Sequence, residues 1–284
     1  TVATGSNTNP QGLVTADLNG DGIPDLATAN NGNGSAGSVS YLQGDGSGGF
    51  SLVSTASLST APAWIEAGDL DNDGDRDLVV VNGSTAGTIT VFKNDGLGGF
   101  TNSGNYTAGP TLQRATLADI DSDGNLDVLV TNGANNQLNL MLGTGTGSFG
   151  SAQPLVSGIA GTPTGVRTAD LNRDGKQDIV FARASGGLSA GITSILNLSK
   201  PTAGAGATPT FPATVIERYS APQTLTLNNT GSALLQIGDL TVTGADSGDY
   251  VVTSDKCTGR SVKANSSCTV QVRFGPTAVG TRSA

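Results

Sequence analysis

The chain has 284 residues, with 23 Asp plus Glu against 14 Lys plus Arg, no His, and a formal net charge of −9. The absence of His excludes a Ser/His/Asp or Cys/His catalytic apparatus. The two Glu residues, Glu66 and Glu217, fall in different predicted domains, which argues against a paired-Glu glycosidase. No basic patch marks a nucleic-acid surface. We therefore expect a protein that is not an enzyme and does not bind nucleic acid.

The composition also indicates the fold class. Gly accounts for 42 residues and charged residues for 13%, and helix-favouring Glu is nearly absent, so we predict an all-β, turn-rich chain long enough for two domains. No stretch approaches the ~18 apolar residues of a membrane span, and no signal peptide remains at Thr1. A mature secreted form, or an excised fragment, has these features.

Four acidic loops recur at intervals of roughly fifty residues, which indicates a repeat protein. They begin at Asp17, Asp69, Asp119 and Asp170, and each places Asp or Asn at positions 1, 3, 5 and 9 around a Gly at position 6. The second loop, residues 69–77, has a carboxylate at every one of these positions. Most of the aspartates lie in these loops, so the negative charge is local rather than spread over the surface.

Carboxylates crowded into a tight loop repel one another and raise one another's pKa, and a hard cation removes this penalty. Calcium takes about six to eight oxygens, which Asp, Asn and backbone carbonyls supply. The Gly at position 6 permits a sharp turn, which lets the carbonyl at position 7 join the side chains. We predict Ca²⁺ as the cofactor, with about four ions. The predicted metal ligands are Asp17, Asn19, Asp21, Ile23, Asp25, Asp69, Asp71, Asp73, Asp75, Asp77, Asp119, Asp121, Asp123, Asn125, Asp127, Asp170, Asn172, Asp174, Lys176 and Asp178.

The loops have two alternative interpretations. An EF-hand closes with a bidentate Glu at position 12 between two helices, but position 12 is Thr28, Val80, Val130 or Phe181 here. The acid at position 9 is followed at once by a short apolar, β-branched run, such as residues 78–81, which predicts a buried strand. The loop therefore joins strand to strand. The other alternative is a set of Asp/Gly turns without metal, which four copies in register disfavour.

Each repeat is predicted to run strand, acidic loop, strand, turn, strand, Gly-rich turn, strand. Because one such sheet cannot bury both of its faces alone, neighbouring sheets must pack on it. The predicted strands are residues 13–16, 26–29, 39–42 and 50–56 in the first repeat, with third strands at 88–92, 137–142 and 192–196 in the later ones.

In the first three repeats the third predicted strand is followed by a Gly-x-Gly-x-Phe sequence, at residues 46–50, 96–100 and 145–149. Together these features closely resemble the FG-GAP/VCBS repeat family, the calcium-loop β-propeller repeats also found in integrin α-subunits. The resemblance covers residues 1 to about 200, and it implies four-stranded blades with one calcium in a loop at the end of each first strand. The repeats lie near residues 10–60, 61–109, 110–160 and 161–200.

Four repeats raise the question of how the propeller closes, since the resembled family usually closes with more blades. We expect a compact four-bladed arrangement, because an open arc exposes two apolar blade faces. The alternatives are a natural fragment and one part of a larger ring completed by another chain. Residues 1–9 resemble the tail of a preceding blade, and in the compact arrangement they would pair beside the last blade.

The predicted first strands place one set of side chains on a common face through their period-two pattern. This set contains Trp64, Glu66, Arg114 and Arg167, which come five or three residues before a loop. If the first strand is innermost, the set lies near the axis, where propellers commonly bind ligands. We name these four as candidate ligand-binding residues. The alternative is a structural salt bridge beneath a packed Trp.

The last part of the chain has a different pattern. Residues 201–208 are rich in Pro, Gly and Ala and predict a linker. Beyond it, residues 209–284 carry short alternating strands whose spacing predicts an immunoglobulin-like β-sandwich. The predicted strands are residues 224–231, 234–237, 240–243, 250–253 and 268–274.

Three segments of this sandwich, residues 225–232, 244–250 and 268–276, resemble the bacterial choice-of-anchor D or ASPM/HYDIN-type domain. The pattern of that family continues with another strand after residues 280–284, so the sandwich is predicted to lack its last strand. An exposed sheet edge invites pairing with another chain, which predicts self-association.

The only two cysteines, Cys257 and Cys268, both lie in this last part. An even count in a Thr-, Ser- and Asn-rich chain favours a disulfide and an oxidising compartment, and paired cysteines also belong to the choice-of-anchor D resemblance. The alternative is two buried free thiols.

These features lead us to predict a secreted, calcium-stabilised bacterial surface protein that acts in adhesion or as an extracellular structural subunit. Its expected partner is a cell-surface or matrix protein or a glycan. A second class is a carbohydrate-binding propeller, which the single Trp and the 4% aromatic content weaken because sugar sites usually stack on rings. A third class is a self-assembling fibre or sheath subunit that exchanges strands at the sandwich edge.

Overall fold

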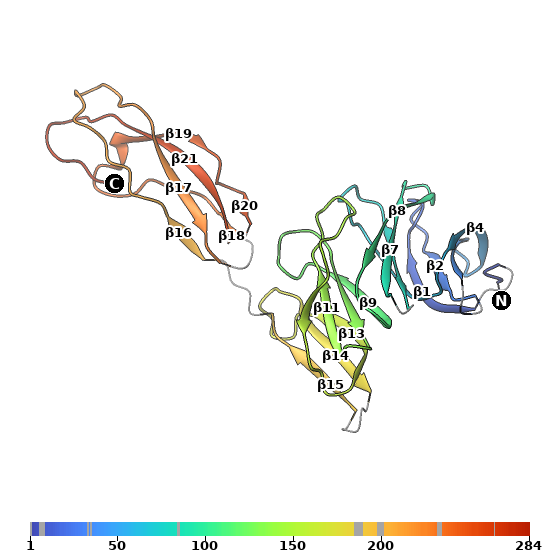
Figure 1. Cartoon of the computed structure of the whole chain (residues 1–284). Coiled ribbons are helices and arrows are strands. Elements are labelled where there is room, and N and C mark those ends of the chain that lie inside the picture. The colour runs from blue at the N-terminus through green and yellow to red at the C-terminus, as the bar shows by residue number, and fades with distance from the viewer. Residues whose placement is uncertain are drawn as a thin grey trace. The chain divides into compact units, whose positions relative to one another are not determined.

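The structure is a computed structural model in which residues 2–5, 9–32, 34, 36–83, 86–184, 190–197, 202–231, 235–263 and 265–284 are described. Two compact units make up the chain (Figure 1), residues 1–120 with 124–197 and residues 121–123 with 198–284. The described parts are strand and loop apart from one turn of 3-10 helix, η1 (Ser247–Asp249). Within them no helix has the length and apolar character needed to cross a membrane.

The first unit contains four antiparallel sheets, each built from strands in chain order. The predicted succession of strand, acidic loop, strand, turn and strand is confirmed in all four repeats. The strands are β1 (Pro10–Ala16), β2 (Asp25–Asn30), β3 (Gly37–Gly44) and β4 (Phe50–Leu58), then β5 (Pro62–Gly68), β6 (Asp77–Asn82), β7 (Thr88–Asn94) and β8 (Phe100–Thr107), then β9 (Leu112–Ala118), β10 (Asp127–Asn132), β11 (Gln137–Met141) and β12 (Gln153–Val156), and finally β13 (Thr162–Ala169), β14 (Asp178–Ala184) and β15 (Gly191–Ile195).

The last of these sheets differs from the prediction, because its described residues form three strands rather than four. In the first three sheets a Gly-rich turn reverses the chain after the third strand, as at Gly96, Gly98 and Gly99 between β7 and β8. After Ile195 the sequence of the fourth repeat lacks the Gly-x-Gly-x-Phe pattern of the first three, and the second unit begins a few residues later.

The second strands of the second and third sheets have an unbroken apolar run because both of their faces are covered. All six residues of β6 are buried, as are all six of β10. Such strands lack the polar and apolar alternation of a half-exposed strand. We call the side of each sheet that meets the next sheet in the chain its following face, and the opposite side its preceding face.

Three buried apolar clusters join the four sheets in order, and β1 packs on β5, β5 on β9 and β9 on β13. Figure 1 shows the sheets in this succession, from blue through green to yellow. Representative members are Ala27 and Val80 in the first cluster, Val79 and Val130 in the second, and Leu129 and Phe181 in the third.

The row of sheets is open, which corrects the expected compact closure. None of the three clusters joins the described residues of β13–β15 to those of β1–β4. Leu13 on β1 and Ile192 on β15 are instead 56% and 76% exposed. The carbonyl of Thr4 accepts a hydrogen bond from the hydroxyl of Ser40 at 2.6 Å, so this part of the N-terminal segment lies beside the first sheet and not the last. Closure depends on the rotation between successive sheets, which the repeated motif does not specify.

The second unit holds a four-stranded antiparallel sheet in the order β16 (Ala203–Ala205), β17 (Gln223–Asn229), β21 (Ser266–Phe274) and β19 (Tyr250–Asp255). Beside it β18 (Leu235–Gln236) pairs with β20 (Ser261–Val262). The predicted strands at 224–231, 250–253 and 268–274 are confirmed. Whether this unit belongs to the immunoglobulin-like class stays a prediction.

Two predictions for this unit were wrong. Ala203–Ala205 lies in the predicted linker but pairs with Leu227–Asn229, because backbone groups alone make a strand ladder and small side chains do not oppose it. Residues 240–243 were predicted as a strand and form none, since their apolar alternation has no partner strand to pair with. Beyond Phe274 the described residues contain no further strand, so β19 is an edge of its sheet.

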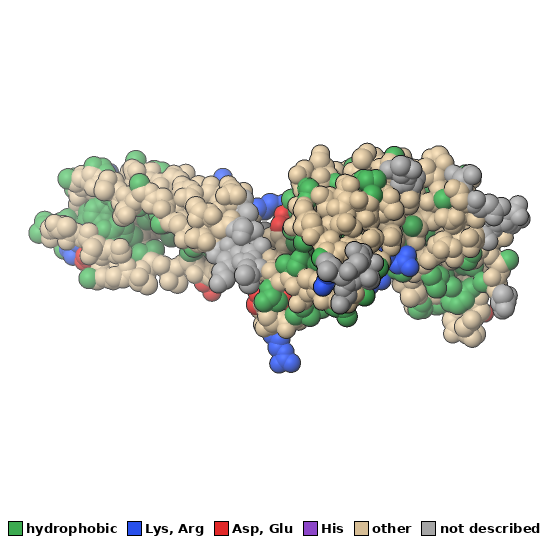
Figure 2. Space-filling model, turned by 60° about the horizontal axis from the view of Figure 1, so that its bottom comes forward, with side chains coloured by type: hydrophobic (Ala, Val, Ile, Leu, Met, Phe, Trp, Pro, Cys, Tyr) green, Lys and Arg blue, Asp and Glu red, His purple; other side chains and the backbone are tan. Residues whose placement is uncertain are grey.

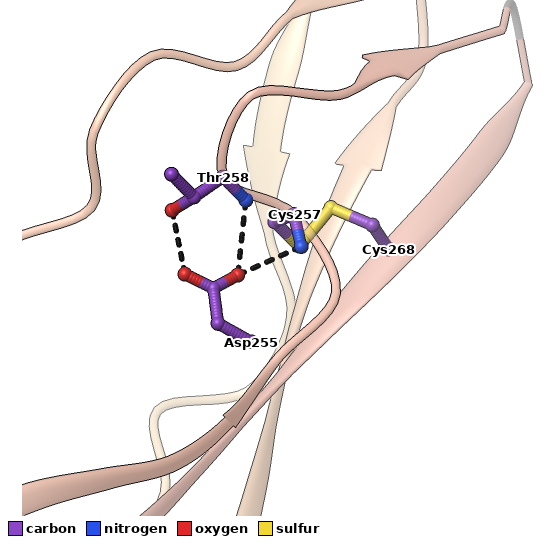
Figure 3. The surroundings of a disulfide bond; sticks show 4 residues. All are labelled: Asp255, Cys257, Thr258 and Cys268. Carbon is purple, nitrogen blue, oxygen red and sulfur yellow. Dashed lines mark hydrogen bonds between the residues drawn. A yellow bond between two sulfur atoms is a disulfide. The ribbon is translucent and has the colours of Figure 1, made fainter.

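Cys257 and Cys268 form a disulfide, as predicted. The carboxylate of Asp255 accepts hydrogen bonds from the Thr258 hydroxyl and from the backbone N–H groups of Thr258 and Cys257 (Figure 3), and these bonds lower the pKa of Asp255. The turn after β19 is therefore held to β21 by the disulfide and closed internally by Asp255.

Removing this disulfide should destabilise the second unit. The cysteines are 11 residues apart, and a loop of this length predicts a loss of about 3 kcal/mol in the free energy of unfolding. The test is calorimetry of a Cys257→Ala, Cys268→Ser variant. The single Trp, Trp64, lies in the first unit and reports on it by fluorescence, so that transition serves as the control. A shift confined to the Trp64 transition would contradict the expectation.

Candidate functional site

The aspartate at position 9 of each loop is a buried clamp on the backbone. Its Oδ2 accepts the N–H of loop position 2 at 2.8 to 3.0 Å, and its Oδ1 accepts an N–H at the end of the third strand at 2.7 to 2.8 Å. Each clamp therefore ties its loop to the third strand of the same sheet. The clamps are Asp25 on Leu18 and Gly44, Asp77 on Leu70 and Asn94, Asp127 on Ile120 and Gly143, and Asp178 on Leu171 and Asn197.

Sequence reasoning treated this residue only as a metal ligand and missed its structural role. A signal was available, because the acid stands directly before a buried strand, where a carboxylate needs hydrogen-bond donors. The environments of the clamps differ. Burial raises the pKa of Asp77, and the nearby carboxylates of Asp71 and Asp73 add to the rise, whereas the N–H of Asn197 lowers the pKa of Asp178.

The glycine at position 6 turns each loop as predicted. Gly22, Gly74, Gly124 and Gly175 all have positive φ, between 80° and 99°. The N–H of each donates to Oδ2 of the aspartate at position 1, at 2.8 to 3.1 Å. A Cβ at these positions would meet nothing within 4 Å, so the need for glycine comes from the backbone conformation.

Position 4 is also left-handed in every loop, which the sequence did not reveal. Gly20 fills it in the first loop, whereas Asn72, Ser122 and Arg173 adopt φ of 62°, 59° and 62° in the others. Asn tolerates this conformation well, but Ser and Arg do so at a cost.

Replacing Arg173 with Gly should stabilise the fourth loop. A left-handed residue with a Cβ costs about 1 kcal/mol or more, and the first loop shows that Gly fits the position. We expect the free energy of unfolding of the first unit to rise by about 1 kcal/mol, measured by urea denaturation in chelator. Gly175→Ala, two residues away, is the matched control and should lower it. Equal effects of the two substitutions would show that φ does not decide stability here.

The second loop gathers carboxylate oxygens that have too few donors. One oxygen from each of Asp69, Asp71 and Asp77 lies within 4.8 Å of the others. Asp69 Oδ1 and Asp71 Oδ1 are buried and have no hydrogen-bond partner. Lys93 Nζ reaches the other oxygen of Asp71 at 2.8 Å. Buried carboxylate oxygens without donors are costly, so this donor set fits a cation with several oxygen ligands.

The other loops vary on this arrangement. Asp119, Asp121 and Asp127 form an equivalent group of three carboxylates in the third loop. The first and fourth loops have Asn19 and Asn172 at position 3, and no such three-carboxylate group is found in the described residues of either. Position 5 carboxylates accept the N–H two residues later in three loops, as Asp21 does from Ile23 at 2.8 Å. The ligand role of the position 7 carbonyls stays a prediction.

The four residues of the predicted axial set do meet. The guanidinium of Arg114 lies 4.1 Å from the centre of the Trp64 ring and that of Arg167 lies 5.6 Å from it. Glu66 accepts from Trp64 Nε1 at 2.7 Å and from Arg167 Nη1 at 3.0 Å. The guanidinium of Arg114 donates to the backbone carbonyls of Ala63 and Gln113 and has no carboxylate partner among the described residues.

Arg114 and Arg167 also line a hollow of about 320 Å³. Its other walls are mainly apolar and come from β13–β15, including Val180, Ala182 and Ile192. The Arg167–Glu66 salt bridge beside Trp64 matches the alternative interpretation of this set. Arg114, in contrast, has no ionic partner among the described residues.

A family model for the FG-GAP-like repeat matches residues 17–80, 69–130 and 119–181. Together these matches cover more than half of the chain, and each runs from position 1 of one loop into the second strand of the next repeat. No curated protein sequence matches this chain.

Solved structures similar to this chain include two whose overlap with it is instructive. A Lactobacillus plantarum protein is 14% identical over 81% of this chain and 66% of its own, with a TM-score of 0.46. An Agrocybe aegerita lectin, described as recognising non-reducing terminal N-acetylglucosamine, is 20% identical over 65% of this chain and 51% of its own, with a TM-score of 0.40. The chain therefore spans less than two thirds of either protein.

Proposed function

The chain belongs to the FG-GAP-like repeat family, and we propose that its first unit is a calcium-stabilised, non-catalytic binding module that works outside the cell. The observation that carries this proposal is the pair of buried, unpartnered oxygens of Asp69 and Asp71 in a loop that recurs four times. Bound calcium would supply positive charge among these carboxylates. Each loop joins the first strand of a sheet to its second. The ion would therefore also hold the ends of these two strands in place.

The residues favour two strengths of binding. The second and third loops offer Asp at positions 1, 3 and 9, with Asp69, Asp71 and Asp77 in one and the equivalent residues in the other. The first and fourth loops offer the weaker ligand Asn at position 3. Affinity for calcium follows the number of charged ligands. We therefore expect about four ions, two of them bound more tightly.

The test is calorimetric titration of the decalcified full chain with calcium. We expect two classes of sites, and we expect Asp71→Asn and Asp121→Asn together to remove the tighter class. A chain that takes up no calcium at millimolar concentration would overturn the proposal. A single class of sites would overturn the ranking of the loops.

Several features support a place outside the cell. A disulfide joins Cys257 to Cys268, and disulfides persist mainly in oxidising compartments. Calcium sites of modest charge suit the millimolar calcium of extracellular fluids. On the face shown in Figure 2, charged side chains are few and no basic patch is in view. We propose adhesion or extracellular structure at a bacterial surface as the role.

A second candidate function is binding of an acidic glycan, which the unpaired Arg114 beside Trp64 favours. The guanidinium of Arg114, which has no carboxylate partner among the described residues, can pair with the acidic group of a sugar. A glycan array of the full chain tests this. Binding that free acidic sugar competes for, and that Arg114→Ala abolishes while Arg183→Ala leaves it intact, would favour the lectin. Absence of such binding would contradict the lectin function and favour a protein as the binding partner.

A further inference from the structure

The outer face of the last sheet carries residues that are buried in the other three sheets. Ile192 of β15 pairs with Ala182, which stands at loop position 13. Val39, Ile89 and Leu138 occupy the same place in the earlier sheets, where they pair with the residues at position 13 of their own repeats. All three are buried by the next sheet, whereas Ile192 is 76% exposed. The following face of β13–β15 thus has the pattern of an interface, and no sheet among the described residues of the first unit packs on it.

The outer face of the first sheet shows the reciprocal feature. Leu13 of β1 pairs with Thr28 at position 12 and is 56% exposed. Ile65, Ala115 and Val166 hold the same place in the later sheets, where they pair with position 12 and are buried. In the later sheets the side chain at this repeat position packs on the sheet before it in the chain. On the preceding face of β1–β4 the same position holds the exposed Leu13.

Two glycines mark how closely such faces approach. Gly12 and Gly165 both lie five residues before a loop. A Cβ on Gly12 would come within 3.0 Å of the Trp64 and Ile65 backbone of the next sheet. A Cβ on Gly165 would meet nothing within 4 Å. The fourth sheet thus keeps the glycine that admits a close neighbour, although the described residues provide none.

Among the described residues outside the four repeats there is no fifth sheet of the same kind. After β15 it continues into the second unit, whose sheet order β16, β17, β21, β19 is not the strand, loop, strand succession of the repeats. The surface that does repeat the required pattern is the preceding face of β1–β4. Thr4 contacts Ser40 on β3 of that face, but Leu13 on β1 stays exposed.

We propose that the following face of β13–β15 binds the preceding face of β1–β4 of a second copy of this chain. Leu13 of one copy then packs on Gly165 and Ile192 of the other, as Ile65 packs beside Gly12 within the unit. The hollow of about 320 Å³ receives the leucine on its apolar side, formed by Gly165, Val180, Ala182 and Ile192, while Arg114 and Arg167 line its other side. Such a head-to-tail contact leaves one free face at each end, so copies form a ring if the rotation closes and a chain if it does not.

Sedimentation velocity of the full chain over a wide concentration range tests this. We expect the average mass of the wild type to rise with concentration. Leu13→Asp and Ile192→Asp should each weaken association by about tenfold or more, because each would bury an unpaired charge. Leu97→Asp is the matched control, since Leu97 is an exposed aliphatic residue in the turn between β7 and β8 and should leave association unchanged.

Mixing the two variants separates a head-to-tail contact from a symmetric one. Leu13→Asp keeps a working following face and Ile192→Asp keeps a working preceding face, so the mixture should form one-to-one dimers while each variant alone stays monomeric. Ala182→Asp replaces Ile192→Asp if the latter fails to fold. A wild type that is monomeric at every concentration would overturn the proposal. The following face of β13–β15 would then be covered by further residues or by the second unit, or would be left bare. Variants that still associate alone, or that fail to associate when mixed, would also overturn it.

Discussion

Chelation of calcium should lower the unfolding temperature of the first unit, and Asp71→Asn should remove part of that difference. An ion held at ~100 times its dissociation constant contributes about 2.7 kcal/mol per site, because it binds the folded loop and not the open chain. Asp71 Oδ1 is buried without a hydrogen-bond partner, so under the proposed function its charge would serve the ion. In chelator the variant should change little, since relief from the crowding with Asp69 and Asp77 offsets the partly exposed ion pair to Lys93. Trp64 fluorescence follows the transition.

Asp95→Asn is the matched control for this prediction. Asp95 Oδ1 accepts the N–H groups of Leu97 and Gly99, both at 2.9 Å, and these bonds lower its pKa. It lies in the Gly-rich turn outside the four loops, so its replacement should destabilise the unit equally in calcium and in chelator. An Asp71→Asn variant that behaves like Asp95→Asn would assign Asp71 to packing. A wild type that melts identically in both media would remove the basis for calcium stabilisation.

Much of the first unit could be predicted because its signals are local. Asp at position 1 and Gly at position 6 determine a loop through one hydrogen bond and one positive φ, and both recur in every copy. The apolar run after position 9 marks a strand covered on both faces, such as Leu78–Val81 in β6. These features need no knowledge of distant residues. Strand order within each sheet then follows from short connections.

What could not be predicted depends on contacts between distant segments. Leu13 and Ile192 have the sequence pattern of buried residues, yet no local feature tells whether another sheet lies beyond them. The composition of Ala203–Ala205 predicts a linker. This segment forms a strand because β17 offers it backbone hydrogen-bonding groups on the side away from β21. The same limit applied to the axial set. Its period placed Trp64 and Arg114 on one face, but only the structure shows that the guanidinium stacks on the indole.

Replacing Asp77 with Ala should cause the largest loss of stability of any single substitution in the second loop, and the loss should persist without calcium. Asp77 accepts the N–H of Leu70 at 3.0 Å and of Asn94 at 2.8 Å, and it is fully buried. Hydrogen bonds to a charged group contribute about 1.5 to 3 kcal/mol each. The variant also leaves two donors unsatisfied. We therefore expect the free energy of unfolding to fall by about 3 kcal/mol or more in chelator, measured by urea denaturation.

Asp71→Asn in chelator is the matched comparison, because Asp71 belongs to the same carboxylate group as Asp77 and differs in role. If position 9 served only the metal, both variants would be nearly neutral without calcium. If it is the clamp between loop and third strand, only Asp77→Ala destabilises. Asp178→Ala, whose clamp bonds are 2.7 and 2.8 Å, should repeat the result in the fourth loop, where Asn replaces Asp at position 3. Near-neutral Asp77→Ala and Asp178→Ala variants in chelator would show that the loops depend on the ion for their attachment to the sheets.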